Sequence, residues 1–452
     1  MSILTKVGTA LQRLFGDLAP EAAKLSGVIQ RVRKFSAVSL AQTFVLGFLR
    51  NPQASDEQLA QFAVECGVQV TPQAVEQRHS PQLVDFLQRL FEQATQMIVG
   101  SSQVLAPLLE RFTSVIVLDS TTISLPEEAA SHYRGCGARG GKGKAALKLQ
   151  TEWDLRSGAL TQISIEEGRS CDNASSCQDA RRGAGSLRIA DLGYFDVAVF
   201  AAMQAAGEYF LSRLQFGTGV LLETLGATAE AVDLLPWLSR QTASGGLVDR
   251  VIVLGCAQRL RCRLIAWRLP QAQADRRRAK LRQEMQSRKG RAPSVARLAW
   301  CDWSILVTNL PPEQLTPQEA IVLYRARWQV ELLFKRWKSQ GLVAALSGST
   351  AVRQLVRVWA RLLAVLVQHW LVVESMWGQL GKSLSKAGEV VRRFAGRLAA
   401  ALSATQGVDL LLERVLQDIR LVLAKTCRRD RRSEPGTFEL LNNPQQLKFG
   451  LT

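Results

Sequence analysis

The chain has 452 residues, and its 57 lysines and arginines against 39 aspartates and glutamates give a formal net charge of +18 at pH 7. Because apolar residues make up 47% of it, the chain is globular rather than intrinsically disordered, and its length predicts two or three domains. The excess of positive charge indicates a polyanionic partner, most simply DNA or RNA, with a membrane surface as the weaker alternative.

Cysteine usage and hydropathy point to a cytoplasmic protein. The 8 cysteines include no CxxC pair, so we expect reduced thiols rather than a disulfide framework, and 3 histidines argue against zinc chemistry. The apolar segment 362–373 is short and contains Gln368 and His369, so we expect no membrane-spanning segment.

Residues 1 to about 110 are predicted to be helical. The sequence SDEQ at 55–58 is typical of a capping box, Gly67 offers a stop, and Thr71-Pro72 opens a second short helix. This succession is consistent with a helix-turn-helix that places its second helix in a major groove, although a plain helical hairpin is the commoner arrangement. In the first case Gln73, Gln77, Arg78 and His79 are the candidate DNA contacts.

Two short apolar runs further on each end at an aspartate. The run SVIVL precedes Asp119, and the run SLRIA precedes Asp191. Between them, segments 147–155 and 160–166 predict a β-hairpin, followed after Asp172 by a polar stretch that we expect to be helical. An aspartate at a strand end is usually a turn former, and Asp154 and Asp172 are rival acidic residues, the first near the hairpin turn and the second a candidate helix cap.

The segment between Asp191 and residue 312 predicts additional strands. Segments 208–214, 246–255 and 261–268 are strand-like and indicate a β-rich insertion at about 206–312. A basic run containing Arg276, Arg277 and Arg278 follows, which is either a solvated helix face or a track for DNA phosphates. Trp300 and Trp303 flank Asp302 just before a further strand, where a tryptophan is most often a core residue.

The stretch LYRARWQVELLFKRWKSQ, residues 323–340, predicts an amphipathic helix. At about 100° per residue, Tyr324, Arg327, Glu331 and Lys338 fall within roughly 60° of each other. A neighbouring stripe is predicted to face a core; it consists of Leu323, Ala326, Val330, Leu333, Phe334 and Trp337. An ordinary helix with i,i+4 charge pairs is the alternative interpretation. Residues 346–452 then predict a helical region with a basic tail.

The spacing Tyr, two residues, Arg, three residues, Glu, six residues, Lys resembles the YREK signature of DDE transposases from bacterial insertion sequences, specifically the IS-four family. The resemblance implies that Glu331 is the last ligand of the catalytic metal ions and that Tyr324, Arg327 and Lys338 hold DNA phosphate. Asp119, in its Asp-Ser-Thr context, and Asp191, followed by Gly-Tyr-Phe, match the family's first two catalytic aspartates. Two Mg²⁺ ions, with Mn²⁺ as a substitute, would then activate the nucleophile and stabilise the leaving oxygen.

The resemblance also implies a fold and partners. We expect an α/β fold with an RNase H-like core at 111–345, interrupted by the insertion, a DNA-end-recognition domain at 1–110, and a C-terminal region at 346–452 that supports a homodimer on double-stranded DNA. In hairpin-forming relatives a tryptophan stacks on a flipped base, a role that Trp303 matches best and Trp300 second. The remaining alternatives are an RNase H-like nuclease or resolvase, a transposase-derived DNA-binding inhibitor, and a basic RNA-binding protein.

Overall fold

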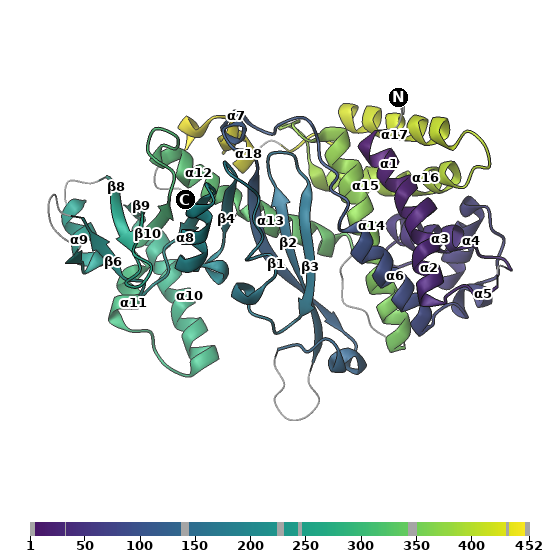
Figure 1. Ribbon diagram of the computed structural model, residues 1–452, viewed down its shortest axis with the longest axis horizontal. Coiled ribbons are helices and arrows are strands. Elements are labelled where there is room, and N and C mark those ends of the chain that lie inside the picture. Colours follow the sequence, from purple (N-terminus) through teal and green to yellow (C-terminus); the bar gives the residue numbers. More distant parts are fainter. Residues whose placement is uncertain are drawn as a thin grey trace. The chain divides into compact units, whose positions relative to one another are not determined.

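The computed structural model describes residues 5–31, 33–136, 144–223, 230–242, 246–341, 350–430 and 434–447. The chain divides into two compact units (Figure 1). Unit 1 comprises Met1–Leu105, Ser120–Ser170 and Val330–Arg432, and unit 2 comprises Ala106–Asp119, Cys171–Gln329 and Ser433–Thr452. Strand β1 (Val115–Leu125) and helix α13 (Trp328–Ser339) each begin in unit 2 and continue into unit 1.

Unit 1 is mainly helical. Its N-terminal helices are α1 (Lys6–Gln12), α2 (Ala19–Ser26), α3 (Ala37–Arg50), α4 (Asp56–Ala63), α5 (Pro72–Glu76) and α6 (Pro81–Ala94). Its C-terminal helices are α14 (Ala351–Met376), α15 (Leu384–Arg393), α16 (Ala395–Leu402) and α17 (Val408–Lys425), and its antiparallel hairpin is formed by β2 (Ala145–Asp154) and β3 (Leu160–Glu167). The hairpin confirms the predicted one.

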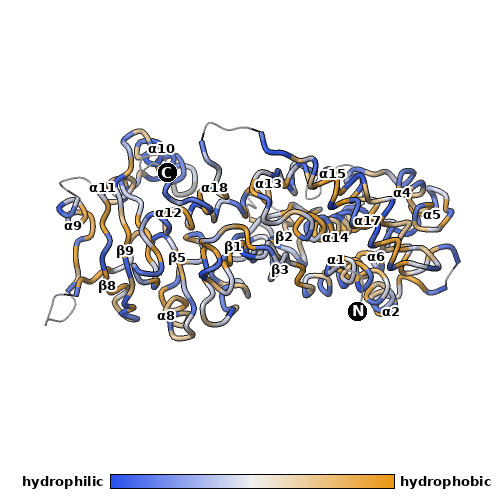
Figure 2. The backbone as a smooth tube through the Cα atoms, turned by 90° about the horizontal axis from the view of Figure 1, so that it is seen from above, coloured by the Kyte–Doolittle hydropathy of each residue, from blue (hydrophilic) through white to orange (hydrophobic). Residues whose placement is uncertain are grey.

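Helix α14 is the centre of unit 1. It packs against α3, α6, α15 and α17 (Figure 1). Hydrophobic residues run along it (Figure 2), and the Thr350 hydroxyl caps its first turn by accepting a hydrogen bond from the Arg353 N–H. By length and composition α14 could cross a membrane, but 94% of its apolar window is buried inside the protein. A helix that is apolar all round needs cover on every side, and other helices supply it.

The C-terminal helices pack with the N-terminal ones, because α3 and α6 contact α14 within unit 1. The division into residues 1–110, 111–345 and 346–452 stays a prediction. Local pattern predicted each helix but gave no information on which distant helix would cover the apolar faces of α14.

The predicted helix–turn–helix segment is present in unit 1. The Ser55 side chain and Gln58 form the expected capping box of α4. Gly67, at φ 74°, ends the following turn in a left-handed conformation that favours glycine. The second helix, α5, has 5 residues.

Unit 2 is built on a mixed sheet. Its helices are α7 (Pro107–Glu110), α8 (Val197–Ala205), α9 (Leu234–Gln241), α10 (Gln271–Lys289), α11 (Val295–Trp300), α12 (Pro317–Ala326) and α18 (Thr437–Asn442). Its strands after β1 are β4 (Leu187–Ala190), β5 (Tyr209–Arg213), β6 (Val220–Leu222), β7 (Glu230–Ala231), β8 (Leu247–Leu254), β9 (Leu260–Arg268) and β10 (Trp303–Thr308). From β1 outward the strand order is β1-β4-β5-β10-β9-β8-β6-β7.

This sheet has a parallel part and an antiparallel part. Strand β4 pairs in parallel with β1 and with β5, and α8 provides the crossover between β4 and β5. Strand β10 then pairs antiparallel with both β5 and β9. The strands predicted at 208–214, 246–255 and 261–268 are confirmed, but the first of them is β5, which belongs to the parallel part. The later strands extend the same sheet.

One predicted helix is wrong. The polar stretch after Asp172 contains one turn of 3-10 helix, Asp172–Ala174, and then irregular backbone. The buried Arg188 of β4 explains why: its guanidinium donates to the carbonyl oxygens of Gln178, at 2.8 Å, and of Ala180, at 2.7 Å. A charged side chain thus satisfies carbonyls that a helix would have paired with backbone N–H groups.

Candidate active site

Two aspartates lie side by side in the sheet of unit 2. The parallel register of β1 and β4 ends with Leu118 opposite Ala190, so the next residue on each strand is Asp119 and Asp191 respectively. Neighbouring strands are about 5 Å apart, which brings the two half-buried carboxylates to one end of the parallel pair. The two apolar runs that were predicted to be strands are therefore parallel neighbours.

Arg327 faces the first of these carboxylates. Its Nη1 lies 3.5 Å from Oδ2 of Asp119, and both side chains are largely withdrawn from solvent, with 13% and 17% exposed. Arg327 follows the last residue of α12, and its guanidinium lies 6.0 Å from the centre of the Tyr324 ring. The pair therefore joins the end of α12 to β1 within unit 2.

Tyr324, next to Arg327, has a buried hydroxyl group. The hydroxyl oxygen has no hydrogen-bond partner among the residues that the structure describes. Burial raises the pKa of Tyr324 to about 12, an effect that the negative charge of Asp191 reinforces and the positive charges of Arg327 and Arg213 oppose. Tyr324 thus stays neutral at physiological pH and keeps a proton that it can donate.

The helix predicted over 323–340 is divided at Arg327. Helix α12 ends at Ala326 and α13 begins at Trp328, and the Arg327 N–H donates to the carbonyl of Tyr324, three residues back, at 3.2 Å. The predicted apolar stripe is confirmed, because all its members are buried; they are Leu323, Ala326, Val330, Leu333, Phe334 and Trp337. A tightened turn therefore separates the two halves of the motif.

Glu331 and Lys338 lie on α13. Glu331 is in its first turn and half-buried, and Lys338 is in its last turn and exposed. By residue, both belong to unit 1, whereas Asp119, Asp191, Tyr324 and Arg327 gather in unit 2.

The acidic pair has the chemistry of a magnesium or manganese site. Both ions prefer oxygen ligands, and Mg²⁺ commonly takes one or two carboxylates together with waters and substrate phosphate. Over the ranges that the structure describes, no group of three or more His, Cys, Asp or Glu side chains gathers as a metal site. Unit 2 therefore supplies two carboxylates, with the positive charge of Arg327 beside one of them.

Trp303 lies in the core instead of on the surface. Its side chain is 4% exposed and packs in the hydrophobic cluster that joins β5, β8, β9 and β10. Both faces of β10 are covered, so the tryptophan at its start is buried with the rest. Trp300 is half-buried, with its ring edge-on to Phe216. Trp328, which the sequence analysis did not select, is 44% exposed directly after Arg327.

The candidate DNA contacts of α5 have different environments. Gln73 and Gln77 are exposed, and the guanidinium of Arg78 lies 5.6 Å from the ring centre of Phe35. The predicted role of His79 is wrong. Its side chain is 5% exposed and its Nε2 lies 3.0 Å from Asp56, so His79 is a structural residue and not a DNA contact.

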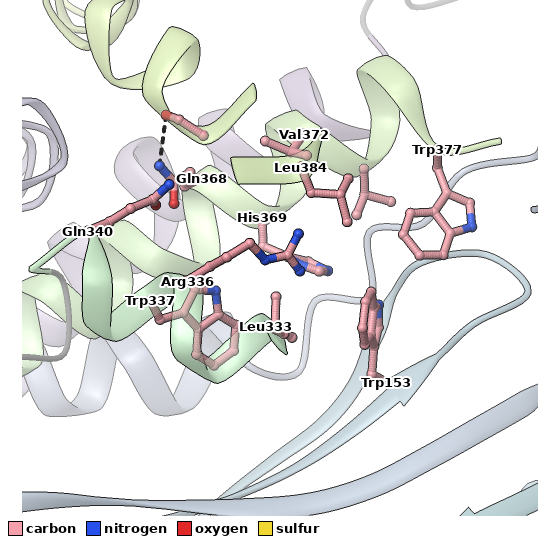
Figure 3. A pocket seen from close by; sticks show the side chains of 12 residues that line it. Trp153, Leu333, Arg336, Trp337, Gln340, Gln368, His369, Val372, Trp377 and Leu384 are labelled. Carbon is pink, nitrogen blue, oxygen red and sulfur yellow. Dashed lines mark hydrogen bonds between the residues drawn. The ribbon is translucent and has the colours of Figure 1, made fainter. Parts of the chain in front are cut away.

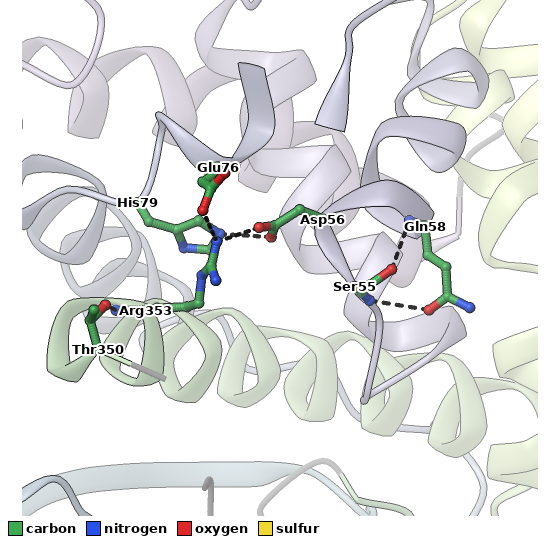
Figure 4. Close-up of polar contacts among 7 residues, drawn as sticks. All are labelled: Ser55, Asp56, Gln58, Glu76, His79, Thr350 and Arg353. Carbon is green, nitrogen blue, oxygen red and sulfur yellow. Dashed lines mark hydrogen bonds and ion pairs between the residues drawn. The ribbon is translucent and has the colours of Figure 1, made fainter. Parts of the chain in front are cut away.

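His79 belongs to a charged cluster in unit 1 (Figure 4). Arg353 of α14 pairs with Asp56 and, at 3.2 Å, with Glu76, so that Asp56 receives both His79 and Arg353. Burial lowers the pKa of His79, and the hydrogen bond that its Nε2 donates to Asp56 partly offsets this. Through these ion pairs the cluster links α4 and α5 to α14.

Unit 1 contains a small cavity between α13, α14 and the β2–β3 hairpin. It has a volume of about 30 Å³ and is lined by Trp153, Trp377, Arg336 and His369 among others (Figure 3). This volume holds roughly two waters. The His369 Nε2 is already 2.8 Å from the carbonyl oxygen of Gly158, and burial lowers the pKa of His369 to about 4, so the imidazole is neutral.

Comparison with known proteins identifies the family that this arrangement matches. Residues 110–367 match the family model described as a transposase DDE domain. The transposase for insertion sequence element IS231B of Bacillus thuringiensis subsp. berliner is 29% identical over 366 residues, covering 77% of this chain and 75% of the relative. That for IS231C of the same organism is 26% identical over 97% of this chain and 95% of the relative. The transposase for IS1151 of Clostridium perfringens is 24% identical, covering 68% and 67%.

Proposed function

The chain belongs to the DDE transposase family, and from this we propose that it binds the terminal inverted repeats of its insertion sequence and performs metal-dependent cleavage and strand transfer at their ends. The observation that carries the proposal is the carboxylate pair of Asp119 and Asp191, placed by the register of β1 and β4, with Arg327 and the unpartnered Tyr324 hydroxyl beside it. The strand orders β3-β2-β1 and β1-β4-β5 support an RNase H-like core.

Asp119, Asp191 and Glu331 are the proposed ligands of two Mg²⁺ ions, with Mn²⁺ as a substitute. When bound, these ions lower the pKa of the attacking water or 3′-hydroxyl and stabilise the leaving oxygen. The chain's part is to present carboxylate oxygens from rigid elements: two strand ends and the first turn of a helix. Neutralisation of Asp119 by Arg327 limits the repulsion between neighbouring carboxylates before DNA binds.

Arg327, Tyr324 and Lys338 are proposed to hold DNA phosphate. A guanidinium can donate two parallel hydrogen bonds to a phosphate, whereas Lys338 acts as a point charge. Within the described ranges no group accepts the proton of the buried Tyr324 hydroxyl, so it can donate to a phosphate oxygen without first losing another hydrogen bond. Arg327 would then exchange Asp119 for the phosphate as the carboxylate takes up metal.

The resemblance further implies cut-and-paste movement through a hairpin, with Trp303 on the flipped base. Stacking by Trp303 would require its ring to leave the core of unit 2, where it is 4% exposed. The cleavage experiment described below therefore scores hairpin formation separately from the first nick. Gln73, Gln77 and Arg78 are proposed end contacts, a homodimer on double-stranded DNA the active assembly, and the bacterial cytoplasm its location.

Two other functions share parts of this site. A nuclease or resolvase of RNase H-like fold would use the carboxylates but would not need Tyr324, Arg327 and Lys338. A transposase-derived inhibitor would bind the DNA without cleaving it.

The test is strand cleavage on a duplex carrying the repeat that flanks the gene, resolved on a denaturing gel. With Mg²⁺ the wild type is expected to nick at the repeat boundary, whereas Ca²⁺ or Glu331→Gln supports binding without cleavage. A nick that matures into a hairpin supports the hairpin route. Cleavage by Glu331→Gln would contradict the proposed ligand set, and binding without cleavage by the wild type would favour the inhibitor.

A further inference from the structure

The turn that begins at Asp191 is held by a side chain from another part of unit 2. Residues Leu192–Tyr194 form one turn of 3-10 helix, in which the Tyr194 N–H donates to the Asp191 carbonyl at 3.0 Å. The carbonyl oxygen of Tyr194 accepts a hydrogen bond from Nε2 of Gln178 at 2.9 Å. Gln178 is 3% exposed, and its Oε1 has no hydrogen-bond partner among the described residues. The bond that anchors this buried amide therefore ends on the turn after Asp191.

The backbone of Gln178 is fixed separately, by strand β4. The guanidinium of Arg188 donates to the carbonyl oxygen of Gln178 at 2.8 Å and to that of Ala180 at 2.7 Å. Arg188 is buried, so water competes little for these charge-assisted bonds. Gln178 is thus tied through its backbone to the strand that ends just before Asp191, and through its side chain to the turn that follows Asp191.

A small apolar cluster joins the same segment to the ends of both strands. Its members are all buried; they are Leu118, Cys177, Ala190 and Tyr194. Two of them directly precede Asp119 and Asp191 on β1 and β4, and Cys177 directly precedes Gln178. Side chains packed at interior density resist displacement. The cluster and the amide of Gln178 together leave the turn after Asp191 little freedom to move.

We propose that Gln178 is a positioning residue for the metal site of Asp119 and Asp191. The inference rests on the proposed function, which supplies the metal ions and the role of the two aspartates. A carboxylate holds a cation well only where its oxygens are fixed, and partners behind the ligands typically contribute about 10- to 100-fold in metal affinity. Loss of the bond from Gln178 to Tyr194 frees the turn, and Asp191 then no longer keeps a fixed direction beside Asp119.

Gln368 of unit 1 offers a matched control. It is 4% exposed, and its Nε2 donates to the carbonyl oxygen of Gly388 at 2.9 Å. Gln178→Met and Gln368→Met therefore remove the same kind of buried hydrogen bond and leave a side chain of similar length in its place. A purely structural role for Gln178 would make the two variants alike in every measurement.

The test measures Mn²⁺ binding to the protein without DNA, from the loss of the free-ion EPR signal during a titration. Gln178→Met is expected to raise the Mn²⁺ dissociation constant about tenfold, whereas Gln368→Met should leave it unchanged. Thermal unfolding should show similar losses of stability in both variants, because each loses one buried hydrogen bond. A folded Gln178→Met that binds Mn²⁺ like the wild type would overturn the proposal.

Nicking of the repeat duplex over a series of Mg²⁺ concentrations provides the second readout. Gln178→Met should need about tenfold more Mg²⁺ for half-maximal nicking, yet bind the duplex in Ca²⁺ as the wild type does. If Gln178→Met fails to fold, Gln178→Asn replaces it, because the shorter amide stays polar but no longer reaches the Tyr194 carbonyl. Equal Mg²⁺ requirements in the wild type and a folded variant would contradict the proposal. A wild type that never nicks, beside a Gln178→Met with weakened Mn²⁺ binding, would contradict the proposed function and support the role of Gln178.

Discussion

Two charged clusters, one in each unit, differ in how their charges are balanced. In unit 1, Arg353 pairs with Asp56 and Glu76, and His79 shares Asp56 (Figure 4). In unit 2, Arg327 pairs with Asp119, and over the described part of the chain the buried hydroxyl of Tyr324 has no hydrogen-bond partner.

This difference separates a structural cluster from a binding site. Charges that find opposite charges within the protein hold elements together, here α4 and α5 on α14. A buried donor that finds no partner raises the free energy of the unliganded protein, and an anionic ligand can satisfy it. Substitutions in the two clusters should therefore affect different properties.

The largest effect on folding is expected at Trp303. Trp303→Ala empties a core position of unit 2 and should lower the free energy of unfolding by about 3–5 kcal/mol. The matched change Trp328→Ala, at a 44% exposed position, should cost less than about 1 kcal/mol. Chemical denaturation of both variants measures this. A stable Trp303→Ala that binds DNA but forms no hairpin would contradict the core role and favour base stacking.

Next in size are the two arginines that form ion pairs. Arg353→Met should lower the unfolding free energy by about 2 kcal/mol, because the pair that it breaks is partly screened by solvent, while cleavage of DNA at low temperature persists. Arg327→Met should cost a similar unfolding free energy, because its pair with Asp119 is also largely buried, and should in addition reduce cleavage by about 100-fold or more. Chemical denaturation and single-turnover cleavage of both variants measure these effects. Equal losses of stability and of cleavage in the two variants would contradict the assignment of Arg353 to folding and Arg327 to catalysis.

A smaller effect is expected from the hydroxyl of Tyr324. Tyr324→Phe removes an unsatisfied buried donor, so the variant should be as stable as the wild type or more so. Its affinity for the cleaved DNA end should fall about tenfold. Binding of a pre-cut duplex and thermal unfolding check the two parts. A clear loss of stability would mean that the hydroxyl has a partner within the protein.

The smallest expected effect is on the pH dependence of folding. Burial lowers the pKa of His79 in the folded protein below its ordinary value of 6.5. The unfolded chain then binds the proton more tightly, so the stabilising contribution of His79 is present above pH 6.5 and is lost as pH falls below it. Unfolding at pH 7.5 and 5.5, compared with His79→Gln, should show a shallower dependence in the variant. Equal slopes would show that His79 is not held neutral.

The sequence predicted what depends on local pattern. Apolar runs of strand length ended at Asp119 and Asp191, and these runs form the neighbouring parallel strands β1 and β4. The apolar period of residues 323–340 likewise identified the buried face that carries Trp337.

What the sequence could not predict depends on distant partners. Nothing near residue 178 indicates that Arg188 will take its carbonyl, and nothing in the strand pattern indicates that both faces of β10 are covered and Trp303 is buried. Arg213 stands alone at a strand end and carries no pattern at all. The parallel register of β4 and β5 places it opposite Asp191.

The central claim is that the acidic residue of the unit 2 cluster serves catalysis, whereas that of the unit 1 cluster serves folding. The most direct measurement compares Asp119→Asn with Asp56→Asn in Mg²⁺-dependent nicking and thermal unfolding. We predict that Asp119→Asn binds the repeat duplex and unfolds near the wild-type temperature but does not nick, and that Asp56→Asn unfolds at a lower temperature yet still nicks in the cold. Nicking by a folded Asp119→Asn would contradict the account.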